Sequence, residues 1–110
     1  MNEPTADEKM FAAIAHASGA AVSFVGPLLI WFLKKDQSAF VAYHAIQAGI
    51  YHTIAFVAFM VVTTCTFGFG FILLPLFWLP SLFWAYKVYS TGTTDGYPGI
   101  AQFGRTEQLP

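Results

Sequence analysis

Charged residues divide this sequence into long apolar segments. No Asp, Glu, Lys or Arg occurs between Met10 and Leu33 or between Gln37 and Tyr86. An uncharged run of about 18 or more mostly apolar residues is typical of a transmembrane helix, because about 20 residues rising ~1.5 Å each cross a hydrocarbon core of ~30 Å. The first segment therefore predicts one crossing, and the second is long enough for two.

A turn divides the second segment. Thr63-Thr64-Cys65-Thr66 is followed by Phe67-Gly68-Phe69-Gly70, and a polar run followed by two glycines ends one helix and begins another. We expect a single all-α, polytopic transmembrane domain over residues 1–110. Its three membrane-spanning helices are expected over residues 6–33, 39–62 and 71–89, followed by a short irregular tail over residues 90–110.

The first span has a recognisable start and an interruption. Thr5 and Glu8 have the spacing of a capping box, which predicts a helix that begins near Ala6. A helix unbroken to Leu33 would be ~42 Å long, more than a bilayer core requires. We expect a kink or break at Gly26-Pro27, because a proline inside a helix lacks an N–H and its ring crowds the preceding turn. The alternative is that this segment folds back there as a re-entrant hairpin.

The composition supports a lipid environment and excludes several function classes. The chain is 56% hydrophobic and 10% charged, whereas soluble domains average about 25% charged residues. It has no glycine-rich phosphate loop and no basic patch, so nucleic acid is not expected as a partner. Its one cysteine, Cys65, excludes an internal disulfide. The acidic start of the chain does not resemble the basic start of a cleavable signal peptide.

The basic residues predict an orientation in the membrane. Cytoplasmic loops are enriched in Lys and Arg, so we interpret Lys34, Lys35 and Lys87 as topology anchors on the cytoplasmic side. With three spans, the N-terminus lies outside and the C-terminus inside a bacterial inner (cytoplasmic) membrane. The re-entrant alternative places both termini inside.

Polar residues within the second span are candidates for function. On a helical wheel, His44, Gln47 and Tyr51 share one face, and polar groups inside a membrane pair with other groups of the protein. We therefore expect them to make interhelical polar contacts. His52 lies about 80° from His44 around the helix, an arrangement unsuited to chelating one ion, so no metal site is expected. A proton relay through His44 or His16 is a further alternative, although no carboxylate occurs in the uncharged segments from Met10 to Leu33 and from Gln37 to Tyr86.

A second hypothesis for the histidines is ligation of a tetrapyrrole. A small residue one helical turn before a histidine leaves room for a planar ring, and Ala12 precedes His16 as Ala48 precedes His52. This spacing resembles the antenna-protein pattern for bacteriochlorophyll. His16, His52 and His44 are therefore candidate ligands of a chlorophyll or haem.

Several motifs along the chain resemble those of a known family. They are Asp7-Glu8-Lys9, Ala15-His16-Ala17-Ser18-Gly19, Gly26-Pro27-Leu28-Leu29-Ile30-Trp31 running into Lys34-Lys35-Asp36, Phe40-Val41-Ala42-Tyr43-His44-Ala45-Ile46-Gln47-Ala48, and Tyr97-Pro98. Together they look like a family of small bacterial integral membrane proteins of uncharacterised function, related to the Tic-twenty channel subunit of the chloroplast inner-envelope import machinery. The resemblance implies a polytopic helical fold and a role in protein translocation.

These observations favour a small non-catalytic membrane protein that acts as a structural or accessory subunit of a larger complex. No nucleophile, base and orienting group occur at one membrane depth, so an enzyme is not expected. The expected partners are membrane lipids, some of them bound, and other transmembrane subunits or further copies of the chain. The alternatives are a tetrapyrrole-binding accessory subunit of a photosynthetic or respiratory complex, and a translocation or channel component.

Overall fold

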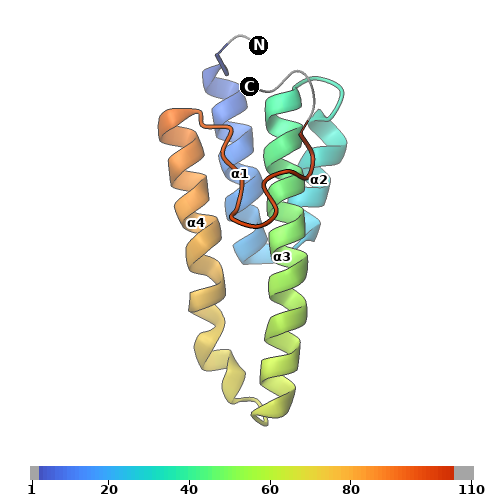
Figure 1. Ribbon diagram of the computed structural model, residues 1–110, viewed down its shortest axis with the longest axis vertical. Coiled ribbons are helices and arrows are strands. Elements are labelled where there is room, and N and C mark those ends of the chain that lie inside the picture. Colours follow the sequence, from blue (N-terminus) through green and yellow to red (C-terminus); the bar gives the residue numbers. More distant parts are fainter. Residues whose placement is uncertain (1–2, 106–110) are drawn as a thin grey trace.

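The computed structural model describes residues 3–105, and all the regular structure in this range is helical (Figure 1). The molecule is elongated, with extents of 49 × 23 × 22 Å. In chain order its elements are α1 (Ala6–Val22), α2 (Val25–Lys34), α3 (Ala39–Cys65), the short 3-10 helix η1 (Phe69–Leu73) and α4 (Leu74–Thr91).

Two helical segments are long and apolar enough to cross a membrane. They are Ala39–Cys65 and Phe69–Thr91, which lie close to the second and third spans expected from the sequence. At ~1.5 Å per residue, the 27 residues of α3 extend ~40 Å and exceed the ~30 Å of hydrocarbon. The turn that joins them bends through positive φ angles at Phe67 and Gly68. The Phe67 side chain there is 95% exposed.

The first apolar segment is two helices, so the prediction of three spans is not confirmed. The backbone turns at Ser23, whose φ of 55° ends α1, and α2 then runs back beside α1 (Figure 1). The reversal precedes the expected break at Gly26-Pro27, because Pro27 is the third residue of α2. At that position its missing N–H leaves no helical hydrogen bond unmade. The α1–α2 pair folds back as the re-entrant alternative expected, but at Ser23 and not at Gly26-Pro27.

This hairpin brings the charged parts of the chain to one end of the molecule. The start of α1, the α2–α3 loop and the end of α4 all lie at the same end, and α1 and α2 cover only that half of α3 and α4 (Figure 1). The expected orientation, with the N-terminus outside and the C-terminus inside, required an odd number of crossings. The structure does not support it, because the chain reverses once more than expected.

Short-range chemistry sets where these helices begin. The capping box predicted at α1 is confirmed, since the Glu8 N–H donates to Thr5 Oγ1 at 3.1 Å and the Thr5 N–H donates to Glu8 Oε1 at 3.0 Å. Ser38 caps α3 by accepting from the Val41 N–H at 3.2 Å. Its hydroxyl also donates to the second carboxylate oxygen of Glu8. One carboxylate therefore ties together the starts of α1 and α3.

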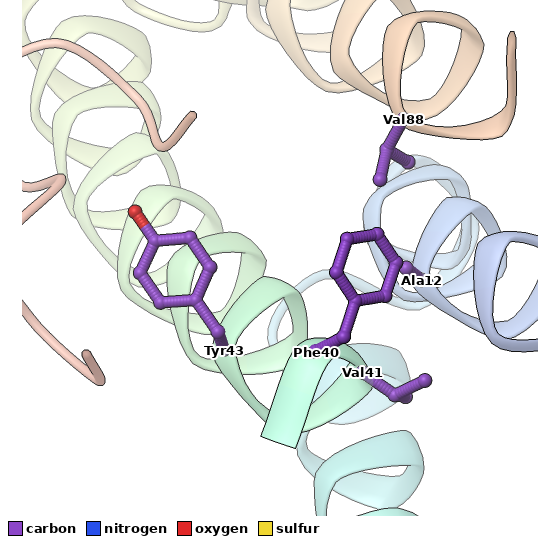
Figure 2. Close-up of a cluster of buried hydrophobic side chains, with 5 residues drawn as sticks. All are labelled: Ala12, Phe40, Val41, Tyr43 and Val88. Atoms are coloured by element: carbon purple, nitrogen blue, oxygen red, sulfur yellow. The ribbon is translucent and has the colours of Figure 1, made fainter. Parts of the chain in front are cut away.

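The apolar core joins three helices at the charged end. Figure 2 shows Phe40 of α3 with its ring between Ala12 of α1 and Val88 of α4, with Val41 and Tyr43 on either side of it. All five side chains are at most 1% exposed. Closer to the hairpin tip, Gly19 of α1 permits contact with α3, because a Cβ there would overlap the His52 ring.

The tail after α4 does not leave the helices. Gly92, with φ of 66°, ends α4, and the chain then passes back across α1 and α3 (Figure 1). Tyr97 is only 3% exposed. The sequence analysis expected an irregular tail, and residues 92–105 contain no α-helix or strand. Residues 106–110 of that expected tail lie outside the described residues.

Candidate functional site

The most polar buried region lies where α1, α3 and the tail meet. Its members are His16 of α1, His44 and Gln47 of α3, and Tyr97 of the tail. The first three are fully buried. Buried polar groups are costly unless they are hydrogen-bonded, especially where water is absent. The partners of these four side chains therefore indicate what the region can do.

A chain of hydrogen bonds links two histidines to the tail. His16 Nδ1 lies 2.8 Å from Tyr97 Oη, and His16 Nε2 lies 3.0 Å from His44 Nδ1. His44 Nε2 lies 2.7 Å from the carbonyl oxygen of Thr93. A carbonyl only accepts, so His44 Nε2 carries the hydrogen. For neutral rings, His44 Nδ1 then accepts from His16 Nε2–H, and His16 Nδ1 accepts from the Tyr97 hydroxyl. One tautomer of each ring satisfies every nitrogen.

Gln47 fastens the same tail from α3. Its side-chain nitrogen donates to the carbonyl oxygens of Ile100 and Phe103, both at 2.7 Å. Its side-chain oxygen accepts from the Tyr97 N–H at 3.0 Å. One turn earlier, the Tyr43 hydroxyl donates to the carbonyl oxygen of Ala101 at 2.7 Å. The amide thus satisfies three backbone groups of a segment that has no secondary structure of its own.

Tyr97 also packs between two aromatic rings. Its ring stacks on Tyr51 of α3 at a centroid distance of 4.7 Å and on Trp84 of α4 at 4.9 Å. Burial raises the pKa of Tyr97 far above its ordinary value of 10.0. The phenol therefore stays protonated and is available as the donor that His16 Nδ1 needs.

The other polar residues of α3 face α4 and α1. Tyr51 donates its hydroxyl to the carbonyl oxygen of Phe77 in α4 at 2.6 Å. His52 Nε2 lies 3.3 Å from the carbonyl oxygen of His16. The structure thus places His44, Gln47 and Tyr51 in contacts between helices or with the tail. It brings His16, which the sequence analysis treated separately, into the same network.

Sequence reasoning missed two members of this network. Tyr43 and Tyr97 were not expected to be site residues, yet both join the tail to the helices. The available signal was weak: Tyr43 directly precedes His44, and Tyr97-Pro98 was noted only as a motif after the last span. Neither position predicts a contact with a histidine 81 residues away in the chain.

The structure bears on the cofactor hypothesis without testing it. Both ring nitrogens of His16 and of His44 have partners within the protein, so a tetrapyrrole metal would have to displace one of them. Within residues 3–105 no group of three or more His, Cys, Asp or Glu side chains is placed to hold a metal ion. His52 uses only Nε2 in the hydrogen bonds of the described residues. Ligation of a tetrapyrrole by these histidines stays a prediction.

The three anchor lysines lie at the charged end of the molecule. Lys34 Nζ lies 4.1 Å from the centre of the Phe11 ring, and Lys35 Nζ lies 4.7 Å from that of Trp31. Lys87 pairs with Asp95 of the tail at 3.3 Å. The hydrogen bond from Lys87 lowers the pKa of the Asp95 carboxyl, assisted by one with Thr93. Their role as topology anchors stays a prediction.

Comparison with known proteins identifies the family. The family model for MamF/MmsF, described as the magnetosome magnetite crystal formation protein family, matches residues 7–98. This match overturns the resemblance to the Tic-twenty-related family, which was wrong. The motifs used for that resemblance all lie within the matched range. No curated protein and no solved structure matches the chain.

Proposed function

The chain belongs to the MamF/MmsF family of magnetosome magnetite crystal formation proteins, and we propose that it serves this process as a non-catalytic accessory protein of the magnetosome membrane. Membership also makes the expected location more specific, because the magnetosome membrane is an intracellular bacterial membrane derived from the inner membrane. A role in protein translocation was implied only by the resemblance to the Tic-twenty-related family, which was wrong, so that role is not proposed.

The observation that carries this proposal is the closed hydrogen-bond chain from Tyr97 to Thr93. Every ring nitrogen of His16 and His44 is satisfied by the protein itself. The chain ends on a backbone carbonyl, which can accept a hydrogen bond and cannot pass a proton onward. Such an arrangement favours anchoring of the tail over catalysis or proton transfer.

The anchored tail makes the charged end of the molecule an ordered surface. It brings Asp95 to Lys87 and places Arg105 over the Tyr43 ring at 5.1 Å. The Arg105 guanidinium also donates to the carbonyl oxygen of Thr94 at 3.1 Å. We infer that this surface faces the cytoplasm, because all the Lys and Arg residues gather at this end and basic residues favour that side.

The sides of the molecule suit contact with lipid and with other membrane proteins. Leu28, Leu29 and Phe32 of α2 are each more than half exposed, as are Ile54 and Val57 of α3. Apolar surface of this extent does not face water in a stable monomer. The protein would therefore influence crystal growth through the membrane assembly it joins.

The test uses a magnetite-forming strain in which this gene is replaced by variants. His44→Leu breaks the hydrogen-bond chain, and Gln37→Leu changes an exposed side chain outside it. We expect an altered distribution of magnetite crystal sizes with His44→Leu at normal membrane levels of the protein, and an unaltered one with Gln37→Leu. If proteolysis shows that the tail of the His44→Leu variant is no longer docked and the crystals are nevertheless normal, the anchoring role would be overturned. Normal crystals after deletion of the gene would overturn the function.

A further inference from the structure

A cavity lies beyond the tip of the α1–α2 hairpin. The hairpin covers only half the length of α3 and α4, which continue past it (Figure 1). Beneath the tip is a space of about 260 Å³, lined by Ser23 of the hairpin turn, His52, Phe56 and Phe59 of α3, and Phe77 and Trp78 of α4. It lies between the two helices long enough to cross a membrane, so we expect lipid around it.

The walls of this cavity fit a flat ring. Four of its side chains are aromatic, and Phe59 and Phe77 meet edge to face at a centroid distance of 5.9 Å. Aromatic rings favour contact with other rings through offset stacking and edge-to-face packing. The volume is below the ~300–1,000 Å³ of pockets that enclose drug-sized ligands, so one ring fits rather than a macrocycle.

The residues that line the cavity include hydrogen-bond acceptors that have no partner within residues 3–105. His52 Nε2 points to the carbonyl oxygen of His16 and therefore carries the hydrogen. In the neutral ring, Nδ1 is then an acceptor, and no donor within residues 3–105 reaches it. Two further acceptors lie at the end of α1. Its last hydrogen bond runs from the Ser23 N–H to the carbonyl oxygen of Gly19, so the carbonyls of Ala20 and Ala21 have no intrahelical partner. Both of these residues line the cavity.

These acceptors indicate that a ligand of the cavity should carry a hydrogen-bond donor. Lipid chains offer no hydrogen-bond donor, so an acyl chain in the cavity would leave the His52 acceptor unsatisfied. A ring that carries hydroxyl groups would donate to His52 Nδ1 while its faces contact Phe59 and Phe77. Such a molecule reaches the site through the membrane, because Phe56 and Trp78 at the rim are partly exposed, at 46% and 36%.

We propose that this cavity binds a membrane-soluble hydroxylated ring, the chemical class of the isoprenoid quinols, with a ring hydroxyl donating to His52 Nδ1. The inference concerns binding alone and goes beyond the proposed function, since it does not depend on the tail or on magnetite. It also predicts a preference between oxidation states. A quinol offers the hydroxyl donors that His52 requires, whereas the quinone offers only acceptors.

The test is a binding titration of the purified full-length chain in lipid nanodiscs. A Trp31→Phe/Trp84→Phe background leaves Trp78, which lines the cavity, as the only tryptophan. Decylubiquinol and decylubiquinone are the probes, and decanol tests an aliphatic chain without a ring. We expect saturable quenching of Trp78 by the quinol and binding about tenfold weaker for the quinone, the ratio that corresponds to one lost hydrogen bond to a buried group.

Three variants decide the result. His52→Leu should remove the preference for the quinol, and Ala55→Phe should abolish binding by filling the cavity, because Ala55 lines it and is 9% exposed. Val57→Phe, on the lipid-facing side of α3 where Val57 is 56% exposed, is the matched control and should bind normally. Equal binding of quinol and quinone, displacement of the quinol by decanol at the same concentration, or undiminished binding in Ala55→Phe would each overturn the proposal.

Discussion

His16 Nε2 lies 3.0 Å from His44 Nδ1, in a fully buried contact between α1 and α3. The outer nitrogens of the pair face Tyr97 and the carbonyl oxygen of Thr93, so each ring has one tautomer that satisfies all its bonds. Two residues from the first half of the sequence thus depend on the tail for their partners. The tail in turn owes its position to them, since its described part, residues 92–105, contains no α-helix or strand.

Removing the hydroxyl of Tyr97 tests this mutual dependence. In Tyr97→Phe, the ring can still stack on Tyr51 and Trp84, but His16 Nδ1 loses the hydroxyl that donates to it. An unsatisfied buried acceptor costs about 1–3 kcal/mol, so we expect a lower midpoint of thermal unfolding in detergent. Tyr86→Phe, at an exposed tyrosine on α4, is the control. A Tyr97→Phe midpoint equal to that of the wild type would show that the hydroxyl does not stabilise the fold.

Gln47 should control whether the tail stays docked. Gln47→Leu removes the hydrogen bonds to Ile100, Phe103 and the Tyr97 N–H. Each of these hydrogen bonds contributes a net free energy of about 1 kcal/mol to docking of the tail. Their loss should therefore speed trypsin cleavage at Arg105 by about tenfold or more, measured by release of a C-terminal tag. Gln37→Leu, at an exposed glutamine of the α2–α3 loop, should be cleaved at the wild-type rate. Slow cleavage in both variants would mean that other contacts hold the tail.

Two glycines provide a matched test of the hairpin packing. A Cβ at Gly19 would overlap the His52 ring, whereas a Cβ at Gly49 would meet Pro27 Cβ at 3.9 Å, an ordinary contact. We expect Gly19→Ala to destabilise the protein by about 1–3 kcal/mol through overpacking. Gly49→Ala should be neutral or stabilising by up to about 1 kcal/mol, because alanine favours a helix. The check is the thermal unfolding midpoint of each variant, and the reverse ranking would contradict the placement of α1 against α3.

The sequence allowed the elements governed by local chemistry to be predicted. The capping box at Thr5 and Glu8, the start of α3 at Ala39 and the turn around Gly68 all appear close to their expected positions. Each depends on residues within a few positions of one another. The length of the apolar runs was a sufficient guide for α3 and α4, because lipid imposes nearly the same requirement on any spanning helix.

The hairpin and the tail contacts depend on distant residues, and the sequence did not determine them. Pro27 suggested a break, but the chain reverses at Ser23, where Gly19 and Gly26 let α1 approach α3 and α2. Length alone could not distinguish one crossing from two shorter helices. Likewise, the polar face of His44 and Gln47 predicted polar contacts, and only the fold identifies the tail as the partner of Gln47.

The Glu8 carboxylate predicts a dependence of stability on pH. The hydrogen bond from Ser38, together with the backbone N–H of Thr5, holds the pKa of Glu8 below its ordinary value of 4.5. A carboxyl whose pKa is lower in the folded state stabilises the fold fully above its unfolded pKa, and that contribution is lost as pH falls through the folded pKa. We expect the unfolding midpoint to decline below about pH 4.5, and to decline less in Glu8→Gln. Asp7→Asn, which removes a carboxylate without these hydrogen bonds, is the charge-matched control. If the unfolding midpoints of Glu8→Gln and of the wild type declined equally with falling pH, the prediction would be contradicted.

The central claim is that the α1–α2 hairpin returns the chain to the face from which it starts, and labelling of cysteines tests this claim most directly. Cys65 is the only cysteine. It is exposed and is the last residue of α3, whose end lies far from the α2–α3 loop (Figure 1). In intact isolated magnetosomes, a membrane-impermeant maleimide should leave Cys65 unlabelled until the membrane is permeabilised. In a Cys65→Ser background, Glu3→Cys and Asp36→Cys should both be labelled without permeabilisation, because the hairpin returns the chain to the same face. Labelling of Glu3→Cys and Asp36→Cys from opposite faces would show that the first apolar segment crosses the membrane, and would contradict this structure.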